Sequence, residues 1–362
     1  MHLSKHHYAI ELAKFCKKVY FLNPPYKNGS IGTVISTTEF DNIYSVKYKP
    51  FFNHSIRFHI RPVFDFLIWV QIKLLLFKLK EKIDIVWCFE PNIYSNLKHF
   101  NANISIFHPV DQIQFKYQIN VAKSADIIFS VSKSILSKIL IFQKPTYFVN
   151  HGVSDSFFIK QNAVLAPLIK PSNRIRVGYI GNLYISSLDR ECLNLIIQNF
   201  PDIIFEFWGA KEIANNNLSG DNSEKSIEWV EWLENKDNVI LNGALSKIEL
   251  AKAIKKTSVF LVCLDNELDK NNGANSHKIL EYLSTGKVVV SKPIQEYENS
   301  KHLIEVTESN DSNEYLALFE KVISNLDYYN SEKLIEERIK FACKNTYQNQ
   351  LLTIVDYLLK LN

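Results

Sequence analysis

Short apolar runs that end in polar or glycine-containing turns recur along the whole chain. Such runs are typical of strands buried on both faces of a parallel sheet. Segments with apolar residues three and four positions apart lie between them, which predicts helices and hence an α/β chain. The expected strands are residues 19–22, 83–89, 104–107, 125–132, 146–149, 176–183 with its glycine turn, 203–207, 239–241, 259–264 and 288–290.

Polar residues and glycines follow many of these strands. Parallel sheets bind their ligands at the carboxyl ends of strands, so these positions are candidates for a site. Six of the ten glycines lie in or beside such turns, which favours functional turns over random loops. In the first half of the chain the strand-end residues are Glu90, His108, Asp111, Asn150, His151 and Gly152.

Residues 275–291 combine a loop, a helix, a turn and a strand. Ser276 is a candidate N-cap, because its hydroxyl can accept from a first-turn N–H. Gly286 suits the positive φ that ends a helix, and a buried strand is expected after it. Lys278 and Glu281 are three positions apart and therefore share one face of the helix.

The charges of Lys278 and Glu281 indicate a nucleotide site. A cation in the first turn opposes the helix dipole unless an anion lies beside it. A diphosphate at the helix end, with ribose hydroxyls donating to Glu281 one turn later, accounts for both charges. The alternative is an ordinary exposed Lys–Glu pair on a helix surface.

The run Ser276-x-Lys278-x-x-Glu281-Tyr-Leu-x-x-Gly286-Lys-x-Val-Val resembles the donor-nucleotide motif of GT-B glycosyltransferases. It is closest to the family 4-like enzymes that build bacterial surface polysaccharides. The resemblance implies an α/β GT-B fold, with two Rossmann-like domains facing across a cleft. It also implies that Lys278 contacts the diphosphate and Glu281 the ribose.

The resemblance covers residues 4–25 weakly and 105–300 well. By this match Gly181 and Asn182 border the diphosphate, while Trp208, Gly209 and Leu245 border the base. For Trp208 the alternative is a plain core aromatic. The full set of expected donor-binding residues is Gly181, Asn182, Trp208, Gly209, Asn242, Gly243, Leu245, Ser276, His277, Lys278 and Glu281.

Asp111 and His108 are the expected catalytic residues, since glycosyl transfer needs a base for the acceptor hydroxyl. A helix N-cap role for Asp111 and a structural role for His108 are the alternatives. Glu90, which precedes Pro91, is more often structural. The segment that begins Asn150-His151-Gly152 resembles the Asn-Gly-Val-Asp segment where these enzymes leave their first domain, and it is expected to border the cleft.

This sequence departs from the family pattern at three places. Gly273 stands where retaining members often carry a Glu, and no Arg or Lys occurs between Leu183 and Asp189. These departures speak against a retaining mechanism and suggest an inverting one with Asp111 as the base; the stereochemistry stays open. The first β-strand and its glycine loop are also expected to be missing, because the first helix begins almost at Met1.

Length and charge both suggest two domains. Residues 1–160 hold 20 Lys and Arg against 10 Asp and Glu, and the remaining residues hold 22 against 28. Drift in lysine content is the alternative explanation. The expected parts are an acceptor-side domain at 1–160, a linker at 161–173, a donor domain at 174–340, and a C-terminal helix at 341–362 that packs back on the first domain.

Other features limit the chemistry. The five scattered cysteines predict buried structural thiols in a reducing compartment. No Asp-x-Asp pair occurs to hold a metal against phosphates, so neither a metal nor another cofactor is expected. No nucleic-acid partner is expected. No signal peptide is recognised at the N-terminus, which favours a cytoplasmic chain.

Residues 51–82 mix large apolar residues with Arg and Lys and predict a helix from about Pro62. A basic, aromatic-rich helix can lie on an anionic membrane surface. The alternative is a core helix with a solvated basic face. A lipid-linked acceptor would support the interpretation that the helix contacts the inner face of the plasma membrane.

The sequence therefore predicts a glycosyltransferase that moves a sugar from a nucleotide-sugar donor to a growing cell-surface glycan, free or lipid-linked. Capsule, O-antigen and exopolysaccharide are the glycans considered. Two alternatives stay open. A GT-B nucleotide-sugar epimerase would use the same donor site without an acceptor. A non-catalytic sugar- or nucleotide-binding partner would bind nucleotide weakly or not at all.

Overall fold

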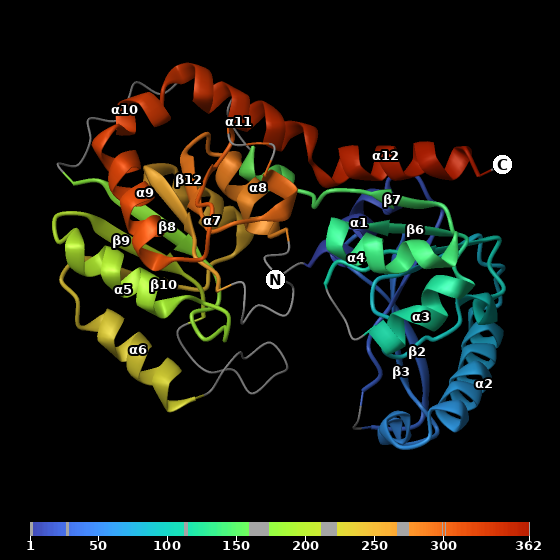
Figure 1. Ribbon diagram of the computed structural model, residues 1–362. Coiled ribbons are helices and arrows are strands. Elements are labelled where there is room, and N and C mark those ends of the chain that lie inside the picture. The colour runs from blue at the N-terminus through green and yellow to red at the C-terminus, as the bar shows by residue number, and fades with distance from the viewer. Residues whose placement is uncertain are drawn as a thin grey trace. The chain divides into compact units, whose positions relative to one another are not determined.

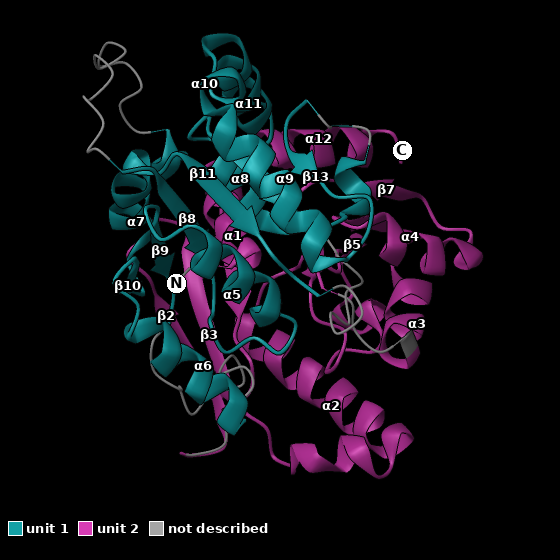
Figure 2. Cartoon of the chain, turned by 60° about the vertical axis from the view of Figure 1, so that its left-hand side comes forward, with its two compact units in different colours: residues 1, 151–346 teal, residues 2–150, 347–362 magenta. Residues whose placement is uncertain are grey.

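The computed structural model describes residues 3–26, 29–111, 115–158, 174–210, 223–265, 275–298, 300 and 302–361. The expected linker at 161–173 and Gly273 lie outside the described residues. The chain divides into two compact units (Figure 2). Unit 1 holds residues 1 and 151–346, and unit 2 holds residues 2–150 and 347–362.

A six-stranded parallel sheet forms the centre of unit 1 (Figure 1). Its order, β10-β9-β8-β11-β12-β13, is that of a doubly wound dinucleotide-binding sheet. The order reverses between β8 and β11, so the carboxyl ends of these strands are where such sheets bind ligands. The strands are β8 (Arg176–Ile180), β9 (Ile204–Trp208), β10 (Val239–Gly243), β11 (Val259–Val262), β12 (Val288–Ser291) and β13 (Glu305–Val306).

Apolar side chains cover both faces of this sheet. Val288 and Val290 of β12 belong to one hydrophobic cluster, and Val289 belongs to another. The prediction of a strand buried on both faces is thus confirmed. One cluster packs α5, α6 and α9 on the sheet, and the other packs α7 and α8. The helices of unit 1 are η4 (Asp155–Phe157), α5 (Arg190–Asn199), α6 (Glu224–Glu234), α7 (Lys247–Ala253), η5 (Ile254–Lys256), α8 (His277–Leu283), η6 (Gln295–Tyr297), α9 (Ser312–Ser324), α10 (Leu326–Tyr329) and α11 (Glu332–Lys344).

Unit 2 contains two sheets. Four strands pair in parallel and in sequence order: β4 (Ile85–Cys88), β5 (Ile104–Phe107), β6 (Ile127–Ser130) and β7 (Thr146–Phe148). A separate sheet has the order β1-β3-β2, with β1 and β3 parallel and β2 and β3 antiparallel. Of this sheet the sequence predicts β1, at residues 19–22; the polar, β-leaning residues 31–46 are compatible with strands or a loop, and they form β2 and the start of β3. Its strands are β1 (Val19–Leu22), β2 (Gly32–Thr37) and β3 (Ile43–Lys49).

The last helix of the chain completes the core of unit 2. Leu351 and Ile354 of α12 lie in one hydrophobic cluster with Tyr8, Ile106 and Phe129. Among the described residues, no helix reaches the length and apolarity that crossing a bilayer requires. The helices of unit 2 are α1 (Ser4–Ala13), η1 (His54–Phe58), α2 (Arg61–Leu79), η2 (Leu97–Phe100), α3 (Phe115–Ser124), α4 (Lys133–Ile139), η3 (Leu140–Phe142) and α12 (Tyr347–Leu359).

The cysteines are only partly as expected. Cys88, Cys192 and Cys263 are buried free thiols. Cys343 is exposed and Cys16 is half-buried, so the expectation of buried structural thiols is wrong for Cys343. Cys343 lies near the end of α11, whose apolar side is narrow enough to leave this position in solvent.

Candidate functional site

Three glycines lie at the carboxyl ends of neighbouring strands in unit 1. The N–H of Gly181, after β8, donates to the carbonyl of Trp208 at 2.8 Å, and the N–H of Gly209 donates to the carbonyl of Gly243 at 3.0 Å. A Cβ added at Gly209 would lie 1.7 Å from the carbonyl oxygen of Gly181. No side chain fits in that space, so glycine is required for the backbones to approach this closely.

Helix α8 packs against β8 beside these glycines. The N–H of Ile180 donates to the hydroxyl of Tyr282 at 2.8 Å, which ties the helix to the strand. Ser276 is the N-cap by position, but its side chain makes no capping hydrogen bond, so that part of the prediction is wrong. Gly286 has the expected positive φ of 77°. The helix is only seven residues long, so we base the site on side-chain charges and not on a helix dipole.

Lys278 reaches the glycine turn. A Cβ added at Gly181 would lie 2.9 Å from Lys278 Nζ and 2.5 Å from the hydroxyl of Tyr179. The structure therefore brings Lys278 close to Gly181, and the family resemblance assigned both of them to a diphosphate. Burial lowers the pKa of Lys278, the Lys247 ammonium lowers it further, and the Glu281 carboxylate raises it. The ammonium is poorly solvated, and an anion beside it would stabilise it.

Glu281 has a partner that the sequence analysis missed. Its side chain is 4% exposed, and its carboxylate forms an ion pair with Lys247, the first residue of α7. The signal was present in the sequence: Ser246 and Glu249 form a capping box, which starts a helix directly after β10. Lys247, Lys278 and Glu281, which we call the charge trio, carry one net positive charge in a largely buried place.

A histidine joins the segment before α8 to the start of unit 1. His151 is buried, and its Nε2 lies 2.8 Å from the carbonyl oxygen of Asn275. A carbonyl only accepts, so Nε2 carries the proton. Burial lowers the pKa of His151 to about 4, so the ring is neutral at pH 7. His277, at the start of α8, packs edge-on against His151 with ring centres 5.9 Å apart.

The remaining donor-side candidates lie in several environments. Trp208 is 3% exposed and belongs to a hydrophobic core cluster, so the structure favours the alternative of a core aromatic. Asn242 lies at the irregularity in the β9–β10 pairing and is exposed. Leu245 is also exposed. Asn182 accepts from the N–H of Tyr184 at 3.0 Å, which shapes the turn after β8.

The catalytic candidates of unit 2 differ in accessibility. His108, directly after β5, is 0% exposed, and its ring lies 5.2–5.9 Å from those of Tyr8, Trp87, Phe89 and Phe129. This enclosure favours the structural alternative for His108. Asp111 is exposed. Residues 112–114 lie outside the described residues, so capping by Asp111 stays a prediction.

The other strand-end residues of the first half take simpler roles. Glu90 is exposed, and its carboxylate accepts from the side chain of Asn92, a local turn contact that fits the structural expectation. Asn150 is the last residue of unit 2 before the chain enters unit 1. Gly152 is buried in unit 1 next to His151.

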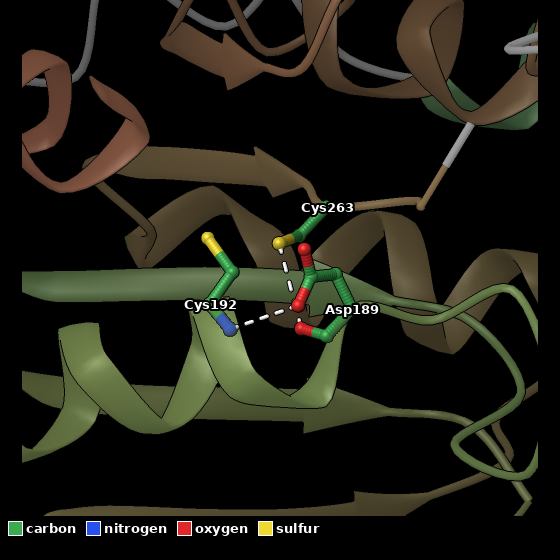
Figure 3. A group of neighbouring side chains, drawn as sticks. All are labelled: Asp189, Cys192 and Cys263. Atoms are coloured by element: carbon green, nitrogen blue, oxygen red, sulfur yellow. Dashed lines mark hydrogen bonds between the residues drawn. The ribbon is translucent and has the colours of Figure 1, made fainter. Parts of the chain in front are cut away.

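Among the described residues, one group could offer metal ligands: Asp189, Cys192 and Cys263, whose ligand atoms lie within 4.8 Å of one another (Figure 3). The Asp189 carboxylate already accepts from the N–H of Cys192 at 2.9 Å and forms an ion pair with Lys292. Burial raises the pKa of Cys263, which keeps its thiol protonated. The group is therefore better suited to holding α5 against β11 than to binding a metal.

Comparison with known proteins gives the fold. No family model matches the chain, and no curated protein matches it. Among solved structures, sucrose-phosphate synthase from Thermosynechococcus elongatus has a TM-score of 0.73 at 11% identity, over 99% of this chain and 92% of that one. The UDP-forming α,α-trehalose-phosphate synthase from Burkholderia xenovorans has a TM-score of 0.66 at 10% identity, over 94% of this chain and 93% of that one. A glycosyltransferase from Rickettsia africae has a TM-score of 0.62 at 15% identity, over 87% of this chain and 84% of that one.

The chain has the GT-B fold. The expectation of fold class is thereby confirmed, and unit 1, with its doubly wound sheet, is the unit that carries the glycine turns and the charge trio. At these identities the similarity speaks for the architecture, and the chemistry has to be argued from the residues of this chain.

If a nucleoside diphosphate binds at Lys278, as the resemblance implies, its affinity is expected to fall as the pH rises through the pKa of Lys278 in the free protein. That pKa lies below its usual value, while a bound diphosphate favours the ammonium and raises it. Binding therefore takes up a proton above the free-state pKa and weakens there. Calorimetry between about pH 7 and 10 measures the effect. Lys278→Arg, which stays charged, should show no such fall; an identical fall in that variant would contradict the assignment.

Proposed function

We propose that this chain is a nucleotide-sugar-dependent glycosyltransferase whose donor site is the charge trio with the Gly181 turn. The observation that carries the proposal is the approach of the Lys278 ammonium to Gly181 at the end of the first strand of a doubly wound sheet. A glycine backbone and a poorly solvated cation form a suitable site for a diphosphate. The GT-B fold and the motif at Ser276–Gly286 support it.

Each member of the charge trio has a role in this proposal. Lys278 neutralises the charge that develops on the leaving diphosphate. Glu281 accepts from ribose hydroxyls, and Lys247 holds its carboxylate in place. Asp111, an accessible carboxylate of unit 2, takes the proton of the acceptor hydroxyl. We propose that transfer proceeds without a resident metal, since the cation next to the diphosphate is Lys278.

For the acceptor we propose a growing surface glycan, free or lipid-linked, handled at the cytoplasmic side of the membrane. The motif similarity to family 4-like enzymes supports this class. The solved structures with the same fold include enzymes named for sucrose phosphate and trehalose phosphate, so the glycan acceptor rests on the motif alone. Contact with a membrane belongs to this part of the proposal.

Calorimetric titration with UDP, GDP, CDP and dTDP tests the donor site. One nucleotide is expected to bind, and Glu281→Ala is expected to cost about 1.5–3 kcal/mol of binding free energy, as loss of a charged hydrogen bond does. Lys247→Met is the matched control, because it breaks the same ion pair but keeps the carboxylate. It should cost less than Glu281→Ala.

Two results would count against the proposal. Equal losses for Glu281→Ala and Lys247→Met would mean that the ion pair, and not the carboxylate, matters for binding. If none of the four nucleotides binds the wild type, the chain is better explained as a non-catalytic partner.

A further inference from the structure

Helix α2 of unit 2 exposes a row of apolar side chains, which we call the α2 row: Val63, Phe66, Leu74 and Phe77, with the half-buried Val70 between Phe66 and Leu74. The spacings of three and four residues place them on one face of the helix. Phe77 is 80% exposed and Phe66 59% exposed. The opposite face, with Phe64, Ile68 and Leu75, packs in the core of unit 2, so α2 is apolar on both sides.

The exposed apolar residues concentrate around this helix. Of the 24 large hydrophobic residues that are exposed among those described, 19 belong to unit 2 and eight lie between Phe51 and Phe77. In Figure 1, α2 lies at the edge of unit 2, and no other labelled element of that unit lies on its outer side. Singly exposed apolar residues are ordinary, but a contiguous row with aromatic members marks a binding surface.

The charges around the α2 row are mainly positive. Residues 51–82 hold six Arg and Lys against Asp65 and Glu81. Asp65 is paired with Arg61 at 2.8 Å, and Glu81 is paired with Lys18. Lys73 and Lys78 are exposed and lie on the two sides of the row, and the ion pairs found among the described residues include neither. An apolar row flanked by lysines matches the boundary between acyl chains and anionic headgroups.

We propose that the α2 row docks this protein on an anionic lipid bilayer, with Phe66 and Phe77 inserted at the level of the acyl chains and Lys73 and Lys78 at the headgroups. A protein partner or a second copy would explain the apolar row, but not the excess of unpaired positive charge on both sides of it. The inference deepens the proposed function on its acceptor side, because it brings the enzyme to a membrane where lipid-linked acceptors lie.

Sedimentation with vesicles tests the docking without any sugar transfer. The full chain is mixed with vesicles of phosphatidylcholine alone or with about 30% phosphatidylglycerol, at about 0.1 M salt. Binding is expected only to the anionic vesicles. Phe66→Ser with Phe77→Ser should lower the partition coefficient at least about tenfold. Lys73→Glu with Lys78→Glu should lower it about fivefold or more per residue.

The matched control removes exposed apolar residues from unit 1. Ile240→Ser with Tyr328→Ser, two exposed positions outside the charge trio, should leave vesicle binding unchanged. Circular dichroism and nucleotide titration of every variant confirm that it is folded. Because nucleotide titration needs no lipid and sedimentation needs no nucleotide, failure of the docking and failure of the donor site give different results.

The fluorescence of Trp69 reports how deeply α2 inserts into the bilayer. Its ring lies 5.7 Å from that of Phe66, and it is partly exposed. Lipids brominated on the acyl chain should quench its fluorescence on binding, and Trp69→Phe should remove most of that quenching. Four results would overturn the proposal: no binding to anionic vesicles, equal binding to neutral ones, an equal loss in the control, or a dimer that the Phe66→Ser/Phe77→Ser variant dissociates.

Discussion

Replacing Lys278 with methionine is expected to lower kcat/KM for sugar transfer by about 10²–10³-fold. Methionine keeps most of the apolar stem, so the change removes mainly the ammonium beside Gly181. That ammonium faces the position where we expect charge to develop on the departing diphosphate. Release of nucleoside diphosphate from the donor that calorimetry identifies is the measurement, together with affinity for the same diphosphate.

Asp111→Asn provides the contrast for this prediction. Asp111 lies in unit 2 and is assigned to the acceptor proton, so its loss should lower kcat and leave affinity for the diphosphate unchanged. Lys278→Met should lower both kcat and the affinity for the diphosphate. Activity of Lys278→Met within threefold of wild type would show that the diphosphate is held elsewhere.

Gly209→Ala is expected to destabilise unit 1 by about 3 kcal/mol or more. The added Cβ would lie 1.7 Å from the backbone carbonyl of Gly181, and a backbone atom between two paired strands has nowhere to move. Urea unfolding followed by circular dichroism measures the loss as a lower midpoint.

Gly181→Ala is the matched comparison. Its Cβ would lie 2.9 Å from the ammonium of Lys278, the far end of a flexible side chain, and 2.5 Å from the hydroxyl of the buried Tyr179. Side chains can give way more than the backbone carbonyl that Gly209→Ala meets, so stability should fall by less than in that variant. Displacing Lys278 should nevertheless weaken nucleotide binding by roughly tenfold or more. Equal effects of the two substitutions on both stability and binding would contradict this separation.

The sequence predicted the elements of unit 1 well for a physical reason. Strands such as residues 288–290 are apolar at every position because both faces of a parallel sheet are covered, and this pattern is visible without a structure. The turns at Gly181, Gly209 and Gly243 were equally visible as glycines at strand ends, and at Gly209 the backbone of Gly181 leaves no room for a side chain.

The sequence could not show which polar side chains meet. Glu281 and Lys247 are 34 positions apart, and only the packing of α7 and α8 on the same sheet face brings them together. Burial of individual residues was equally hidden. His108 and Asp111 follow the same strand, yet aromatic rings from three elements enclose the first and the second is exposed. The position of a residue along the chain does not predict such enclosure.

The sequence leaves β2 and the start of β3 between strand and loop for a related reason. Residues 32–37 are polar on most positions and largely exposed, so hydrophobic periodicity gives little signal there. Their pairing with β3 comes mainly from the antiparallel backbone ladder between Gly32–Thr37 and the strand that follows.

The contribution of α12 to the core of unit 2 has a consequence for synthesis on the ribosome. Tyr8 and Phe129 are translated before unit 1, but Leu351 and Ile354, which pack with them, are translated only after it. Unit 1 lies between them in the sequence and can complete its own sheet first. Unit 2 therefore begins to be translated before unit 1 but completes its core after it, and until then its unfilled apolar surface is open to chaperones.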